Sequence, residues 1–158
     1  MTQHPSIDPN LLIVDGTGVG APVVDMFKRS GLYLIPIVIH GGGQITRDKT
    51  LRVPIRDLVG ILQVLLQTKR LKIAAGLPDV RTLVEELLNF QVKISDVGHD
   101  SYGVWREGVH DDLVLAVAMA CWVAEKNILP RGMYFPRPRS NRDNYSGPII
   151  NITARWLG

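Results

Sequence analysis

The chain has 158 residues, a mass of 17.5 kDa and 46% hydrophobic residues, which is typical of one soluble domain that buries a core. Its single cysteine excludes an internal disulfide, and no apolar run approaches the 18 residues of a membrane-spanning helix. The net charge of +3 is uneven: residues 126–158 carry six basic groups against Asp143 alone, whereas residues 1–125 carry twelve basic and fourteen acidic groups.

These values predict a cytoplasmic protein, without a membrane segment, in two parts. Residues 1–126 form a mildly acidic domain, and residues 127–158 form a basic tail rich in proline and arginine. The proline content predicts that this tail is irregular and partly disordered.

The first third of the chain predicts a strand, a short helix and a second strand. Residues 11–15 are an apolar, β-branched run that ends at glycines. A helix is expected from about Pro22 to Gly31, and residues 33–40 predict a second buried strand. A strand-helix-strand unit places its two strands parallel in one sheet.

The middle of the chain predicts a glycine-rich mobile loop over residues 41–52, followed by a helix that begins at Pro54. Residues 69–75 predict a short third strand, and Pro78 begins another helix. That helix is amphipathic, with Glu85 and Glu86 mostly outward. Its expected inward residues are Val80, Leu83, Val84, Leu87 and Leu88.

The last regular elements are a hairpin and a buried helix. Residues 90–96 and 102–106 predict the two strands of the hairpin, with the turn at residues 97–101. The helix is expected from about Asp111 to Lys126. The elements together predict an α/β fold.

Asp15 ends the first strand and is followed by Gly16-Thr17-Gly18-Val19-Gly20, which leaves three interpretations open. Asp15 caps a tight strand-to-helix turn, or it binds a divalent metal, since hard cations prefer oxygen ligands. The third interpretation is a dinucleotide-binding turn. Two observations count against it: Asp15 would repel a phosphate, and the next strand ends at His40 instead of an acidic residue that could bind the ribose.

A second acidic group, His110-Asp111-Asp112, opens the apolar run of residues 113–120. Aspartate is a preferred helix N-cap, and the helix dipole stabilises negative charge there. Two consecutive carboxylates exceed what capping needs, and a cation would neutralise their repulsion. Asp15, Asp111 and Asp112 are therefore candidate ligands of magnesium or manganese.

Basic residues between the two acidic groups are candidates for DNA contact. Lys49, Arg52 and Arg56 can bind phosphates by charge and, for arginine, by paired hydrogen bonds. The alternative is an ordinary solvated loop and helix face.

Several segments, in this order, resemble the nuclease domain of phage and prophage terminase large subunits. The similarity covers roughly residues 9–125. The segments are Leu12-Ile13-Val14-Asp15-Gly16-Thr17-Gly18-Val19-Gly20, Val53-Pro54-Ile55-Arg56-Asp57-Leu58-Val59, Leu71-Lys72-Ile73-Ala74, Leu83-Val84-Glu85-Glu86-Leu87-Leu88-Asn89-Phe90 and His110-Asp111-Asp112-Leu113-Val114-Leu115-Ala116.

The resemblance implies a ribonuclease H-like fold, in which a mixed sheet is flanked by helices, and an endonuclease that cuts double-stranded viral DNA during packaging. Asp15 would be the second metal-binding carboxylate and Asp112 the last, with Asp111 beside it and His110 as an accessory residue. Two magnesium or manganese ions would bind there. One lowers the pKa of the attacking water, and the other stabilises the leaving 3′-oxygen.

In this family the first carboxylate lies on an early strand of an antiparallel region, for which the ten residues before Leu11 are too few. We therefore expect a domain that lacks its first antiparallel strands, so its enzymatic activity alone stays open. The missing part would come from an N-terminal half, other terminase subunits or self-association. The alternatives are a non-catalytic remnant that binds DNA or a packaging partner, and a small nucleotide-binding protein.

Overall fold

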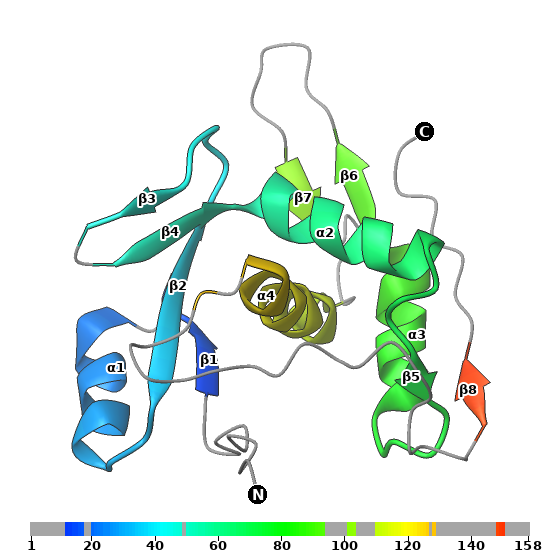
Figure 1. Cartoon of the computed structure of the whole chain (residues 1–158), viewed down its shortest axis with the longest axis horizontal. Helices are drawn as coiled ribbons and strands as arrows, with labels where there is room; N and C mark the ends of the chain where they lie inside the picture. Colours follow the sequence, from blue (N-terminus) through cyan, green and yellow to red (C-terminus); the bar gives the residue numbers. More distant parts are fainter. Residues whose placement is uncertain are drawn as a thin grey trace, which may run out of the picture.

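The fold is described from a computed structural model of the chain (Figure 1). The structure describes residues 12–17, 20–48, 50–93, 101–103, 110–126, 128 and 148–150. It has α/β architecture with a mixed sheet flanked by helices. No helix within these ranges is long and apolar enough to cross a membrane.

The main sheet has the strand order β1-β2-β4-β3. Its strands are β1 (Leu12–Asp15), β2 (Leu34–His40), β3 (Thr46–Arg47) and β4 (Leu51–Pro54). The parallel pairing of β1 with β2 confirms the predicted strand-helix-strand unit, whose helix is α1 (Gly20–Arg29). β4 is also parallel to β2, whereas β3 is antiparallel to β4.

The prediction of a loop over residues 41–52 was wrong in its second half, which contains β3 and the start of β4. Leu51 and Val53 are buried while Arg52 between them is exposed, which is the alternation of a half-buried strand. The glycines at 41–43 obscured this short pattern. β4 is held by its pairing with β2, which no local sequence signal specifies.

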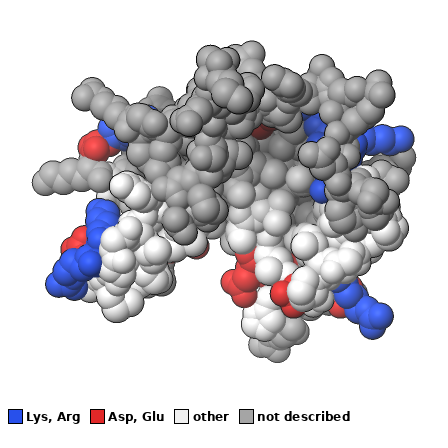
Figure 2. Space-filling model, turned by 60° about the horizontal axis from the view of Figure 1, so that its bottom comes forward, with Lys and Arg blue, Asp and Glu red and all other residues white. Residues whose placement is uncertain are grey.

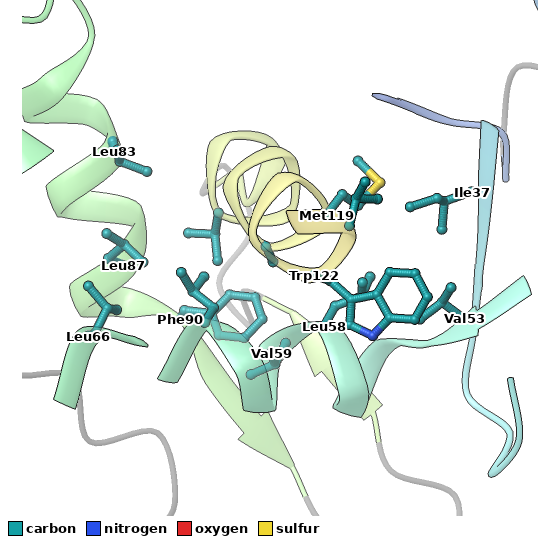
Figure 3. Packing of buried hydrophobic residues seen from close by; sticks show 14 of the residues in the cluster. Ile37, Val53, Leu58, Val59, Leu66, Leu83, Leu87, Phe90, Met119 and Trp122 are labelled. Atoms are coloured by element: carbon teal, nitrogen blue, oxygen red, sulfur yellow. The ribbon is translucent and has the colours of Figure 1, made fainter. Parts of the chain in front are cut away.

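The helix α4 (Asp112–Lys126) occupies the centre of the molecule, where it contacts β1, α2 (Ile55–Gln67) and α3 (Val80–Asn89) (Figure 1). Met119 lies beside Ile37 of the sheet, and Trp122 packs near Val53 and Leu58 (Figure 3). A helix contacted on several sides must be apolar on several sides, which explains its long apolar run. In Figure 1, α1 lies on the other side of β2 from α4.

The register of the sheet places Asp15 on the face that α4 covers. Asp15 is paired with Ile37, and Ile37 is paired with Leu51. Paired residues of neighbouring strands point to the same face, and Ile37 and Leu51 belong to the core that includes α4. The side chain of Asp15 therefore belongs to the inner face, and that of Arg52, which alternates with Leu51, belongs to the outer face.

Two predictions for α3 were wrong. Leu88 was expected inward but is 64% exposed, and Glu86 was expected outward but is 5% exposed. Position 86 lies three residues after Leu83 and four before Phe90, both of them buried, so the helical period puts it on the inner face. The charge of Glu86 had outweighed this spacing in the prediction.

The remaining strands form two small sheets. β6 (Gln91–Lys93) and β7 (Ser101–Gly103) pair antiparallel, which confirms the hairpin, although residues 94–100 lie outside the described residues. The predicted third strand is short: β5 (Ile73–Ala74) pairs antiparallel with β8 (Ile149–Ile150), apart from the main sheet. β8 corrects the expectation of an irregular, partly disordered tail at residues 149–150. Most of the tail lies outside the described residues.

Candidate functional site

Asp15 stands at the carboxyl end of β1, in a turn that is tied to β2. Its Oδ1 accepts a hydrogen bond of 2.8 Å from the backbone N–H of Thr17. The N–H of Gly16 donates to the carbonyl oxygen of Ile37 at 2.7 Å, and the hydroxyl of Thr17 accepts from the N–H of Ile39 at 2.8 Å. The hydrogen bond from Thr17 is the one that the turn-capping interpretation of Asp15 expects, and it uses one of the two carboxylate oxygens.

The neighbouring strand β2 ends at His40, on the same edge of the sheet, because parallel strands end together. Its Nδ1 accepts a hydrogen bond of 3.0 Å from the N–H of Gly42. A Cβ atom at position 42 would lie 2.9 Å from that nitrogen, so a larger residue there would displace the ring of His40 from this contact. The buried Nε2 of His40 has no hydrogen-bond partner among the described residues.

The second acidic group lies at the start of α4. His110 and Asp112 are 80% and 85% exposed in their side chains, and Nδ1 of His110 lies 3.8 Å from Oδ2 of Asp112. Asp111 is half-buried, and its carbonyl oxygen accepts the hydrogen bond of 3.0 Å from the N–H of Leu115 that closes the first turn. Asp111 is therefore the N-cap residue of α4 by its backbone.

The carboxylate that caps α4 comes from α3 and was missed from the sequence. Oε2 of Glu86 accepts hydrogen bonds from the N–H groups of Leu113 at 2.9 Å and Val114 at 3.1 Å. These are amide groups that an N-cap side chain would ordinarily take. The helical spacing of position 86 with Leu83 and Phe90 was the available sequence signal.

The structure does not bring the predicted ligands together. Among the described residues, which include Asp15, Asp111 and Asp112, no group of three or more His, Cys, Asp or Glu side chains could hold a metal ion. The carboxylates present therefore do not by themselves fit the two-ion cluster implied by the resemblance. Their assignment as ligands stays a prediction.

The predicted DNA-binding residues have different surroundings. Arg56 is held locally: its guanidinium donates to the carbonyl oxygen of Gly43 at 2.7 Å and lies 3.8 Å from the carboxylate of Asp57. Arg52 is exposed on the outer face of the sheet, opposite to Asp15, and Lys49 lies outside the described residues. On the face in Figure 2, the basic side chains stand at the left and right margins and the clearest acidic groups lie at the lower centre.

Comparison of the chain with protein-family models, with curated proteins and with solved structures gave no match. Gly18, which belongs to the glycine motif of the nucleotide-binding alternative, lies outside the described residues.

Proposed function

We propose that the chain is part of a terminase-type, metal-dependent DNA endonuclease domain with a ribonuclease H-like fold. The observation that carries the proposal is the position of Asp15 at the carboxyl end of a parallel strand, on the sheet face covered by α4. The same helix contacts β1 and begins with Asp111 and Asp112. Asp15 therefore lies on one element, β1, and the second acidic group lies at the start of another, α4, and these two elements pack against each other.

The capping by Glu86 strengthens the functional interpretation of Asp111 and Asp112. The amides of Leu113 and Val114 are already bonded, so these two carboxylates are not required for that task. The side chain of Asp112 is 85% exposed, so its carboxylate is accessible to a cation or a substrate. In this proposal a further carboxylate, from outside the described residues or from a partner, completes the metal site.

The first experiment is cleavage of supercoiled plasmid by the full chain with manganese. We expect nicking by the unchanged protein and none by Asp112→Asn or Asp15→Asn. Asp79→Asn is the matched control, because Asp79 is an exposed aspartate before α3 with no side-chain cap bond. Cleavage that survives in Asp112→Asn, with folding verified by circular dichroism, would refute the site.

A second candidate is a non-catalytic module that binds DNA or a packaging partner. It is favoured because no three candidate ligands among the described residues form a metal-holding group. It predicts no cleavage by the folded chain but salt-dependent binding of a duplex, measured by fluorescence anisotropy. Arg52→Gln should weaken that binding and lower its salt dependence. Thr82→Gln, which adds the same side chain at an exposed position of α3, should leave both unchanged.

A further inference from the structure

The strands β3 and β4 form a two-stranded ribbon at one edge of the main sheet. In Figure 1 this ribbon stands at the upper left, and β3 is the last strand in the order β1-β2-β4-β3. Every residue from Gly41 to Asp48 is exposed. Within the described part of the chain, no strand pairs with β3 on its outer side. A partner can therefore reach β3 from both faces and along its outer edge.

The register of the ribbon puts one arginine on each face. Arg52 is paired with Thr46. Arg47 is paired with Leu51, which is buried in the core. Because paired residues point to the same face, Arg52 belongs to the outer face and Arg47 to the inner face. Both arginines are exposed, and neither has an ion pair or a side-chain hydrogen bond among the described residues.

Two side chains fix the base of the ribbon, where a glycine turn leads into β3. Nδ1 of His40, at the end of β2, accepts the N–H of Gly42 at 3.0 Å. The guanidinium of Arg56, at the start of α2, donates to the carbonyl oxygen of Gly43 at 2.7 Å. A Cβ atom at position 43 would lie 3.2 Å from Nη2 of Arg56, so a larger residue there would press on this guanidinium. An element fixed in this way loses less conformational entropy when it binds a partner.

The charge of this segment indicates the chemistry of the partner. Residues 41–56 carry four basic groups against Asp48 alone, a net charge of +3 that equals the net charge of the whole chain. Arginine binds phosphate by charge and by paired hydrogen bonds. The ribbon therefore suits a partner that carries phosphate groups.

The placement of the arginines on opposite faces distinguishes between such partners. A flat anionic surface, such as a membrane, could contact the arginine of one face only. A groove of a nucleic-acid duplex has a phosphate backbone along each side, and the major groove of DNA admits a two-stranded β-ribbon. Arg47 and Arg52 can then each reach one of the two backbones. The geometry favours the duplex.

We infer that the β3–β4 ribbon inserts into a groove of double-stranded DNA, where Arg47 and Arg52 contact the phosphates on its two sides. Arg56 is a positioning residue that fixes the ribbon through Gly43. The inference rests on the proposed function in one respect, which is that the partner is DNA. It requires neither a metal ion nor the acidic residues.

The test is binding of a short fluorescent duplex by the full chain, measured by anisotropy in EDTA over a series of salt concentrations. We expect Arg47→Gln and Arg52→Gln each to weaken binding by about 5- to 10-fold near 0.1 M salt and to lower the salt slope by about one. The double variant should show both losses. Arg81→Gln is the matched control, because Arg81 is an exposed arginine on α3, across the molecule from the ribbon (Figure 1).

The positioning role of Arg56 has a separate test. Arg56→Lys keeps the charge but loses the planar group that donates to Gly43. We expect weaker binding with an unchanged salt slope, which a lost phosphate contact would not give. Gly43→Ala should act in the same way, and the two changes together should cost no more than either one, because they break the same contact. Additive losses, or a lower salt slope in Arg56→Lys, would overturn this role.

Three results would overturn the groove contact. They are a loss in Arg52→Gln alone, which would mean that the duplex lies on one face, an equal loss in Arg81→Gln, and binding to vesicles of anionic lipid but not to the duplex. Circular dichroism verifies the folding of each variant. Binding that depends on both arginines, in a chain that never cuts DNA, would uphold the inference and refute the nuclease. Cleavage by the unchanged chain with binding indifferent to both arginines would do the reverse.

Discussion

The hydroxyl of Thr17 accepts a hydrogen bond of 2.8 Å from the backbone N–H of Ile39. β1 ends at Asp15, which is paired with Ile37, so this side chain continues the contact with β2 beyond the last paired residue. Ile39 is itself paired with Val53 on the other side. The hydroxyl of Thr17 thus accepts a backbone N–H that would otherwise bond to a further residue of β1. This bond holds the turn of Asp15 against the sheet.

Replacing Thr17 by valine removes this acceptor and keeps the shape of the side chain. The N–H of Ile39 then loses its partner, and we expect the free energy of unfolding to fall by about 1 kcal/mol. Thr17→Ser, which keeps the hydroxyl, is the control. Urea denaturation followed by circular dichroism measures the difference, and equal midpoints for the valine and serine variants would contradict the role of the hydroxyl.

Asp15 combines a local and a proposed functional role, which asparagine and alanine separate. Asparagine keeps an oxygen that can accept the N–H of Thr17, whereas alanine does not. We expect Asp15→Asn to retain the stability of the unchanged chain and Asp15→Ala to lose about 0.5–1.5 kcal/mol in urea denaturation. Under the proposed function, we expect both variants to lose Mn²⁺-dependent cleavage. If Asp15→Asn is stable and active, Asp15 stabilises the turn and is not a metal ligand.

The sequence predicted those parts of the fold that local patterns specify. The parallel pair β1 and β2, the helix ending at Lys126 and the hairpin all follow from apolar runs, glycines and prolines. β4 was missed because its four residues follow a glycine-rich stretch and gain their hydrogen bonds from β2, a distant segment. Such pairing is a property of the whole sheet.

The candidate site shows the same division. The acidic residues could be predicted, because a carboxylate at a strand end and a pair before an apolar helix are visible as patterns. The role of Glu86 could not, since its two amide partners lie 27 and 28 residues further along the chain. Their approach depends on the packing of α3 against α4. The sequence signal for this role was a charged side chain at a position that the helical spacing places on the inner face of α3.

Two helices end in the same way but with different residues, which allows a reciprocal test. After α1, Gly31 has φ of 79° and its N–H donates to the carbonyl of Lys28. After α2, Lys69 has φ of 57° and its N–H donates to the carbonyl of Leu66. Left-handed backbone costs a residue with a Cβ atom roughly 1–2 kcal/mol, whereas glycine adopts it freely.

We therefore expect Lys69→Gly to raise the free energy of unfolding by about 1 kcal/mol and Gly31→Ala to lower it by a similar amount. A Cβ atom at Gly31 would meet no atom within 4 Å, so the loss there would come from the backbone and not from a clash. Lys69→Ala controls for the lost charge and should not stabilise. Thermal unfolding at matched pH measures all three, and equal stability of the glycine and alanine variants at position 69 would contradict the account.

Cys121 on α4 provides a test of the packing around that helix. Burial raises the pKa of its thiol from 9.0 to about 11, and the negative charge of Glu125 contributes a smaller part of this increase. The folded state therefore favours the neutral thiol, while the unfolded chain releases its proton near pH 9. The resulting stabilisation is complete below pH 9 and is lost as the pH rises from 9 to about 11.

Iodoacetamide should accordingly modify the folded protein slowly at pH 8, with a rate that rises toward pH 11, because the thiolate is the reactive form. Cys121→Ala removes the titrating group, so the loss of stability between pH 8.5 and 10.5 in urea should be smaller in this variant than in the unchanged chain. Glu125→Gln should lower the pKa only in part, since burial is the larger cause. Rapid alkylation at pH 8 at the rate of the urea-unfolded chain would mean that α4 does not pack against its neighbours in solution.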